Sequence, residues 1–562
     1  MRDTVANRAP GAPSFFESFT PKLVSTLREG YTLAHLRADA MAGLTVAIVA
    51  LPLSMAIAIA SGAKPENGLI AAVVGGVLIS ALGGCRFQIG GPAGAFIVLV
   101  AKTIEMHGYQ GFLAATIMSG LILIAIGYAR LGVYIKYIPY SVTIGFTAGV
   151  AVIIFASQIK DLLGLRVEHE PGAFVPKLAA IQAALGTATP AAFGLAAASL
   201  AFIMILRIWN PRFPGLLAAI ALAGFATWAL GLPVETIGSK FGEVPRGLPA
   251  PALPQVSLGQ LTELLPSAVA IALLGGIESL LSAVVADGMT GRRHRSNCEL
   301  AAQGYANIGS ALFGGLCCTG AIARTATNIR AGAHGPVAGI LHALFLLTFM
   351  AVAAPLAAHI PLATLAAVLT IVAWNMIERE QIVAMFKNDH GEALVLAATF
   401  LLTVFEDITV GIGAGVSLGS LLFMHRMAEA VEIESGGAPA GPDEDVEDES
   451  GCYVPERPDA IMTYRINGPF FFGVAATISA VLDAIGPRPE AFILDLTSTP
   501  LADAAAANAL RTFALKAARR KTAVYIVGAN ARVRRTLAAN EVDEELVHFA
   551  EDELSARARI NG

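Results

Sequence analysis

Residues 314–330 form the sequence Gly-Gly-Leu-Cys-Cys-Thr-Gly-Ala-Ile-Ala-Arg-Thr-Ala-Thr-Asn-Ile-Arg, in which a glycine-rich extended stretch precedes a short helical run. Residues 90–94, Gly-Gly-Pro-Ala-Gly, precede a second short apolar run that ends near residue 102. A helix of about ten residues is roughly 15 Å long, half the hydrocarbon thickness of a bilayer. Paired short segments of this kind, at equivalent places in two halves of a chain, are typical of inverted repeats with a binding site near the membrane midplane.

The composition places this pattern in a membrane protein. The 562 residues are 55% hydrophobic and only 14% charged, whereas a soluble globular protein has roughly 25% charged residues. The mean hydropathy is +0.65. The net charge of −5 indicates no preference for nucleic acid, and we expect no nucleic-acid partner. The five cysteines form no C-x-x-C pair, so we expect buried thiols and no metal site.

Apolar segments follow one another from about residue 40 to residue 430 and predict a mainly α-helical polytopic protein that contacts membrane lipid. The predicted spans are 40–60, 66–84, 92–102, 111–130, 138–160, 190–208, 214–231, 262–286, 297–315, 321–330, 336–357, 362–377, 391–405 and 409–426. Lys and Arg are more frequent in alternate loops, including the run Arg292, Arg293 and Arg295. This bias predicts that both termini are cytoplasmic.

Four regions are expected. Residues 1–38 form a cytoplasmic lead-in, residues 39–432 the transmembrane domain, and residues 433–455 an acidic Gly/Pro linker. Residues 456–562 predict a small α/β domain. Its predicted strands are 461–466, 491–496 and 522–527, and its predicted helices are 475–486, 503–519 and 530–539.

The two short helices predict an anion site. Free backbone N–H groups and the helix dipole make a helix N-terminus attractive to anions. Arg324, in the first turn of the second short helix, would add a full positive charge, or would pair with a carboxylate or backbone carbonyls in a structural role. The predicted substrate-binding residues are Leu53, Pro92, Ala93, Gly94, Ala321, Ile322, Ala323 and Arg324.

Glu278 lies in the middle of the eighth predicted span, far in sequence from any basic residue. A carboxylate at this depth is expensive unless a proton or a cation neutralises it. We therefore predict that Glu278 binds a coupling ion, H⁺ or Na⁺. A structural salt bridge and a neutral hydrogen-bonding role are the alternatives. The sequence contains no P-loop, no G-x-S-x-G motif and no cluster of metal ligands, so we expect neither an enzyme nor a cofactor.

Several motifs resemble the sulfate permease (solute carrier 26) family. The first span, from Ala42-Gly43-Leu44-Thr45-Val46-Ala47 through Pro52 to Met55-Ala56, resembles the family's first-span signature. Residues 87–96 and 319–328 resemble the beginnings of its third and tenth spans, and the tail, with residues 493–496 and Asp503, resembles its STAS domain. The resemblance implies fourteen spans in a 7+7 inverted repeat with core and gate domains, a C-terminal STAS domain, and a homodimer.

The resemblance also implies a function. Family members carry sulfate, bicarbonate, chloride, oxalate or C4-dicarboxylates, often with H⁺ or Na⁺, and Glu278 falls where bacterial members have the acid tied to cation coupling. Two positions depart from the family pattern. Leu53 replaces a glutamine that many sulfate-carrying relatives have, and Ala504 replaces the serine that is phosphorylated in regulatory STAS proteins. We therefore expect no phosphorylation switch at residue 504.

The expected function is secondary active transport of small anions of the bicarbonate, sulfate or C4-dicarboxylate class across a bacterial inner membrane, with H⁺-coupled symport by alternating access. The alternatives on the same fold are an uncoupled anion exchanger or channel, and Na⁺-coupled bicarbonate symport. A nucleobase permease would lack the STAS tail and would prefer uncharged partners to Arg324. A membrane-tethered signalling scaffold is disfavoured by the missing serine.

Overall fold

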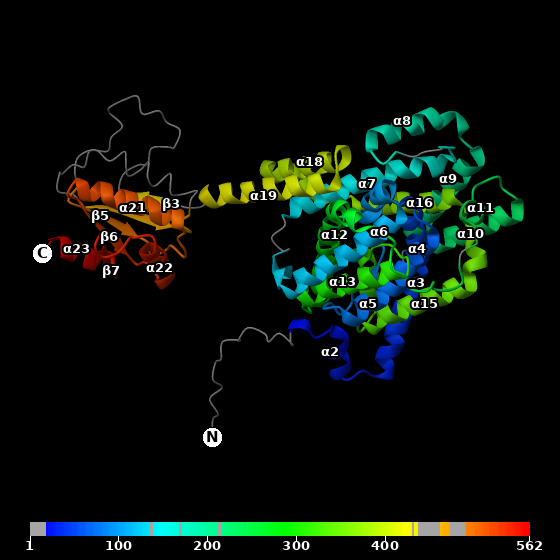
Figure 1. Ribbon diagram of the computed structural model, residues 1–562, viewed down its shortest axis with the longest axis horizontal. Coiled ribbons are helices and arrows are strands. Elements are labelled where there is room, and N and C mark those ends of the chain that lie inside the picture. The colour runs from blue at the N-terminus through cyan, green and yellow to red at the C-terminus, as the bar shows by residue number, and fades with distance from the viewer. Residues whose placement is uncertain are drawn as a thin grey trace, which may run out of the picture. The chain divides into compact units, whose positions relative to one another are not determined.

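The computed structural model describes residues 18–134, 139–167, 171–210, 215–243, 245–429, 432–435, 461–471 and 489–561. The chain forms two compact units, residues 1–416 and 417–562. The first unit is a helical bundle with one two-stranded ribbon (Figure 1). Its elements are α2 (Lys22–Arg28), α3 (Leu33–Ala60), α4 (Pro65–Ile70), α5 (Gly76–Leu82), β1 (Gly90–Gly91), α6 (Ile97–Tyr128), α7 (Tyr140–Leu163), α8 (Phe174–Ala184), α9 (Pro190–Trp209), α10 (Gly215–Leu230), α11 (Ile237–Phe241), α12 (Leu258–Thr290), α13 (Ser296–Leu312), β2 (Thr319–Gly320), α14 (Ile322–Arg330), α15 (Val337–Ala357), α16 (Leu362–Met376), α17 (Arg379–Asn388) and α18 (His390–Phe405). Helix α19 (Ile408–Glu429) contains the division between the units.

Each predicted apolar segment coincides with a helix, and the prediction of a mainly helical membrane protein is confirmed. Within the described residues, nine helical stretches are long and apolar enough to cross a bilayer, so the count of fourteen spans stays a prediction. Helix α3 begins at Leu33, seven residues before the predicted span at 40, because Thr32 caps it by accepting a hydrogen bond from the His35 amide. Residues assigned to the cytoplasmic lead-in also form α2.

Two predicted spans, 92–102 and 111–130, form one element that is broken at Gly108. This residue has φ of 68° and ψ of 174°, a backbone conformation that is open to glycine and strained for other residues. A 3₁₀ turn, Gly94–Phe96, precedes α6. Residues 94–107 therefore form a first half-helix, and α14 is the second half-helix. The first is several residues longer than predicted.

Most extensive helix contacts fall within two groups. One group contains α3, α5, α6, α12, α13, α14 and α15, and the other contains α7, α9, α10, α16 and α18. In the first group α6 crosses α13 at Gly120 and Gly304, where a Cβ on either residue would lie 2.6 Å or less from the carbonyl oxygen of the other. Small residues let membrane helices approach this closely. The two groups agree with the core and gate that the family resemblance implies.

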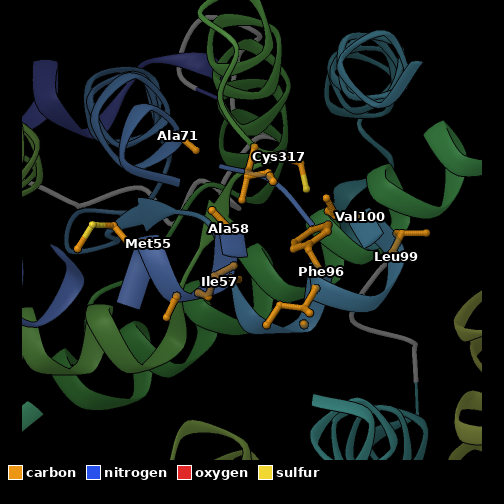
Figure 2. Close-up of a cluster of buried hydrophobic side chains, with 14 of the residues drawn as sticks. Met55, Ile57, Ala58, Ala71, Phe96, Leu99, Val100 and Cys317 are labelled. Carbon is orange, nitrogen blue, oxygen red and sulfur yellow. The ribbon is translucent and has the colours of Figure 1, made fainter. Parts of the chain in front are cut away.

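The core of the first unit is a large apolar cluster that joins both groups of helices. Figure 2 shows part of this cluster, with Met55 and Ile57 from α3, and Phe96 and Val100 from the start of the first half-helix. Cys317, from the stretch before β2, belongs to the same cluster, as expected for a buried thiol. The first half-helix thus begins inside the apolar core.

The second unit contains a five-stranded sheet in the order β3-β4-β5-β6-β7 (Figure 1). Its elements are β3 (Glu432–Ser435), β4 (Met462–Asn467), β5 (Ala491–Asp495), α21 (Ala504–Arg519), β6 (Ala523–Val527), α22 (Ala531–Ala539), β7 (His548–Ala550) and α23 (Glu553–Asn561). Strand β3 is antiparallel to β4, and the other pairs are parallel. Along β5, Phe492 and Leu494 face one apolar cluster while Ala491 and Ile493 face another. Both faces of the sheet are therefore covered, as is usual for parallel strands.

The predicted strands and two of the predicted helices of this unit coincide with β4, β5, β6, α21 and α22. The predicted helix at 475–486 lies outside the described residues. The predicted linker 433–455 begins within β3, whose Ser435 pairs with Tyr464 of β4, so the sheet takes its first strand partly from residues assigned to the linker. The other domain boundaries stay predictions.

Candidate anion site between two half-helices

The two glycine-rich stretches meet as the prediction of paired segments requires. We call residues 83–93 the first extended segment and residues 313–321 the second extended segment. Strands β1 and β2, one from each segment, pair antiparallel, with Gly90 opposite Gly320 and Gly91 opposite Thr319. Both half-helices therefore start from one ribbon and leave it at opposite ends, because the strands are antiparallel. The Arg324 side chain reaches back across the ribbon to Pro92.

Two glycines make this approach possible. A Cβ on Gly320 would lie 1.3 Å from Gln88 Nε2, and a Cβ on Gly91 would lie 2.3 Å from Arg324 Nη1. Gly91 also has φ of 155°, at the edge of the region that favours glycine. A side chain at either position would displace the groups that surround the half-helix N-termini.

Arg324 lies at the centre of this arrangement and is only 3% exposed. Its Nη2 donates to Pro92 O at 3.1 Å and to Ser54 Oγ at 3.3 Å. Its Nε and Nη1 are buried and have no hydrogen-bond partner among the described residues. The bond to a backbone carbonyl is what the structural alternative predicts, but it uses only part of the guanidinium. The remaining donors are of the charged kind that binds anions in proteins.

The residues predicted to bind substrate differ in accessibility. Ala93 is buried and Gly94 half-buried, whereas Ile322 and Ala323 are exposed. A Cβ on Gly94 would lie 3.6 Å from Met376 Sδ of α16 and 3.8 Å from Ile154 Cδ1 of α7. The first half-helix thus starts against the second group of helices, while the first turn of α14 is open.

The other two predicted residues, Ala321 and Leu53, both precede Arg324 in the sequence. Ala321 is half-buried, and its N–H donates to Ile89 O at 3.0 Å, which extends the ribbon by one bond. Leu53 is half-buried on α3 and packs against the large apolar cluster. Its side chain cannot donate a hydrogen bond, so any role in binding an anion would rest on contact alone.

Glu278 is on α12, beside the ribbon. Its Oε2 is buried without a hydrogen-bond partner among the described residues, and no salt bridge reaches it there. Arg324 is the charged group that acts on it, and the attraction is mutual. One turn before, Gly275 O accepts a hydrogen bond from Thr319 Oγ1 at 3.0 Å. Glu278 therefore shares a buried region with the ribbon and the arginine.

Sequence reasoning missed the polar side chains that hold the first extended segment. Gln88 Nε2 donates to Ser279 Oγ at 3.0 Å and to Ser279 O at 3.2 Å. Thr325 Oγ1 accepts from the Ile89 amide at 3.2 Å and from Ser282 Oγ at 3.0 Å. Ser279 and Ser282 both follow Glu278 on α12, so the same helix carries the carboxylate and holds the ribbon. Only contacts between distant segments show this arrangement.

A second set of missed residues does have a sequence signal. Glu299, Gln303, Asn307 and Ser310 are fully buried and recur at helical spacing along α13. Asn307 bonds both backbone groups of Cys318, each at 2.9 Å, and Ser310 Oγ donates to Leu316 O at 2.6 Å. Unwound backbone at membrane depth needs such partners. A polar stripe on an apolar helix could have indicated them.

The far ends of the half-helices also differ. Lys102, near the end of the first half-helix, forms an ion pair with Asp407 in the turn before α19. Burial would raise the pKa of Asp407, but hydrogen bonds from Lys102 and Thr409 outweigh it, and the pKa is lowered. Arg330, in the last turn of α14, is exposed. The Lys102–Asp407 pair connects the two groups of helices.

Comparisons with known proteins agree with this architecture. Residues 36–399 match the sulfate permease family, and residues 453–556 match the STAS domain. The chain is 39% identical to the putative sulfate transporter YvdB of Bacillus subtilis, over 91% of this chain and 94% of the relative. It is 32% identical to the bicarbonate transporter BicA of Synechocystis sp., over 90% of each chain.

A solved structure has the same fold. Murine Slc26a9, described as an anion transporter in the inward-facing state, aligns with a TM-score of 0.85 and covers 99% of this chain and 97% of its own, at 18% identity. A bundle of apolar helices around paired half-helices, followed by an α/β domain, defines a multi-pass membrane protein of the transporter class. This chain belongs to the sulfate permease family, with a C-terminal STAS domain.

Proposed function

We propose that this protein is a secondary transporter of small anions of the bicarbonate, sulfate or C4-dicarboxylate class. The single observation that supports this most is the ribbon that joins the starts of two half-helices beside Arg324, whose Nε and Nη1 have no hydrogen-bond partner in the described part of the chain. Two positive helix ends and two free charged donors attract an anion without a metal. The names of the relatives, sulfate and bicarbonate transporters, support the same class.

We further propose that uptake is coupled to H⁺ through Glu278, by alternating access in a homodimer of the bacterial inner membrane with both termini cytoplasmic. A buried carboxylate oxygen without a hydrogen-bond partner among the described residues is costly as an anion, and a bound proton removes that charge. Protonation also removes the repulsion between Glu278 and a nearby anion, so each ligand favours the binding of the other.

The test is uptake of a panel of labelled anions into proteoliposomes, with and without an inward pH gradient of about two units, because reciprocal coupling requires that the gradient drives accumulation. We expect Glu278→Gln to bind anion but to lose pH-driven accumulation, because glutamine imitates the protonated acid permanently. Glu263→Gln, an exposed acid on the same helix, is the matched control and should accumulate anion like the parent.

Three outcomes are informative. Accumulation by Glu278→Gln in proportion to the pH step would exclude Glu278 as the proton site. If uptake by the parent responds to a Na⁺ gradient alone, Glu278 remains the proposed coupling-ion site and the coupling ion is Na⁺. Uptake that follows neither gradient would identify an uncoupled exchanger or channel.

A further inference from the structure

A cavity of about 290 Å³ lies apart from the half-helices, where three separate segments of the first unit meet. Its charged lining residues are Lys22, Glu29, Arg86, Asp287, Arg292 and Arg293. They come from the N-terminal helix α2 and the residue that follows it, from the start of the first extended segment, and from the end of α12 with its following loop.

Hydrogen bonds fix these segments together. Lys22 N donates to Gly83 O at 2.9 Å. Arg295 N donates to Gly84 O at 3.0 Å, and Arg295 Nη1 donates to Thr20 O at 2.6 Å. The cavity is therefore built by tertiary contacts between distant parts of the chain.

The charges around the cavity are unequal. Four cations face two carboxylates, and each carboxylate is already engaged. Glu29 Oε2 accepts from Arg86 Nη2 at 2.6 Å, and Asp287 Oδ2 lies 2.7 Å from His294 Nδ1. Arg292 approaches Glu29 only to 3.8 Å. Among the described lining residues, positive charge thus exceeds negative charge.

One of the cations, Arg86, is buried, and a second, Lys22, is half-buried. Arg86 is 5% exposed, and its Nη1 has no hydrogen-bond partner among the described residues. Burial lowers the pKa of Lys22, and the neighbouring positive charges of Arg295 and Arg86 lower it further. Like charges that are brought together and partly desolvated are destabilising unless an anion joins them.

A topology signal alone does not explain this arrangement. Cations in a cytoplasmic loop direct membrane insertion equally well when they are fully solvated. Arg292 and Arg293 are exposed and suit that role, but Lys22 and Arg86 are packed against the same cavity.

We propose that this cavity binds a phosphate group, as free phosphate or a phosphate ester, or as the headgroup of an anionic phospholipid. Arginine guanidinium groups match phosphate oxygens in bidentate geometry, and a phosphate carries enough charge to offset the surplus cations. The volume of about 290 Å³ is at the small end of ligand pockets. The cavity shares no residue with the predicted transport site, so the phosphate is a bound ligand and not the transported ion.

The experiment measures the unfolding temperature of the full-length protein in two arms. In the first arm, inorganic phosphate is titrated into protein in phosphatidylcholine vesicles. In the second, increasing fractions of phosphatidic acid replace phosphatidylcholine, without added phosphate. The cavity variant is Arg292→Gln with Arg293→Gln, and the matched control is Arg37→Gln with Arg330→Gln, two exposed arginines outside the cavity with the same change in charge.

We expect the parent and the control to be stabilised, and the cavity variant to need at least about tenfold more ligand for half the effect, since it loses charge-assisted hydrogen bonds. Stabilisation by inorganic phosphate assigns a soluble ligand, and stabilisation by phosphatidic acid alone assigns a lipid headgroup. Lys22→Gln provides the same comparison if the double variant does not fold. The proposal is overturned if neither ligand stabilises the parent, or if the cavity variant responds like the control.

Discussion

The two half-helices begin from paired strands, yet they present different chemistry to the space between them. The first begins with residues that are almost fully buried, such as Ala95 and Phe96. The second begins with Ile322, which is 38% exposed, and carries Arg324 in its first turn. An inverted repeat supplies two similar positive helix ends. The sequence then breaks that symmetry, because the first half-helix is buried at its start whereas the second is partly exposed and carries a positive charge.

The supports of the two extended segments differ as well. The first extended segment is held by α12 and α14, through Gln88 to Ser279 and through the Ile89 amide to Thr325. The second is held largely by α13, through Asn307 and Ser310. The half-helix that carries the arginine therefore also anchors the other segment, and a disturbance at β2 should spread to both.

The largest effect is expected at the point where the two segments touch. Gly320→Ala would place a Cβ on Gln88 Nε2 and force Gln88 away from Ser279. We expect destabilisation of about 3 kcal/mol or more, from overpacking and from lost buried hydrogen bonds, and loss of uptake. Thermal unfolding and proteoliposome uptake measure both effects.

Gly194→Ala, on α9 with open space around the glycine, is the control and should be unchanged or slightly more stable. If Gly320→Ala were as stable and active as this control, the two segments would not depend on close contact at the ribbon.

A smaller loss of stability is expected when only the second extended segment loses its support. Asn307→Ala removes both bonds to the Cys318 backbone. Buried groups left without partners should reduce the free energy of unfolding by about 2 kcal/mol. Asn297→Ala loses one bond, to the Gly132 amide in a half-buried place, and should have less effect. Equal unfolding temperatures for the two variants would show that α13 does not hold this segment.

The smallest effect concerns the far end of the first half-helix. Asp407→Asn breaks the ion pair with Lys102, and we expect a loss of about 0.5 kcal/mol at neutral pH, since the lysine is partly solvated. The folded pKa of Asp407 is lowered below its usual 3.8. The stability that it contributes is therefore present above 3.8 and is lost as the pH falls through the folded pKa.

The check is the pH dependence of the difference in stability between the parent and Asp407→Asn. Unfolding temperatures of the parent and of Asp407→Asn should differ by a constant amount from pH 7 down to about 4 and converge below it. A difference that stayed constant below that pH as well, or grew on acidification, would show that the ion pair does not stabilise this end.

The fold was largely predictable because its signals are local. Run length and hydropathy indicate helices, and the glycine-rich stretches indicate where helices are interrupted. The break at Gly108 falls in the polar stretch that was predicted to separate two spans, but the end of the first half-helix was placed too early, because the sequence does not reveal the φ of that glycine. Strand β7 (His548–Ala550) has three residues, too few for a periodicity to be recognised.

The site was predictable only in part. Arg324 and Glu278 were found because a charge in an apolar span is conspicuous. Gln88 and Ser279 were not, since their bond joins residues 191 positions apart, and neither residue is unusual in its own segment. The pairing of Gly90 with Gly320 was not predicted for the same reason, since it also joins distant segments. Tertiary contacts, not residue types, decide which polar groups remain free for a ligand.

The most direct test of the account is equilibrium binding of a transported labelled anion to purified Arg324→Ala. The asymmetry between the half-helices predicts that binding weakens by roughly 1–3 kcal/mol, the range for a charge-assisted hydrogen bond, with some affinity left from the helix N-termini. Arg330→Ala, at the exposed end of the same helix, should bind like the parent. If Arg324→Ala also binds the anion as tightly as the parent, the arginine is structural, and the two half-helices do not differ in what they contribute to anion binding.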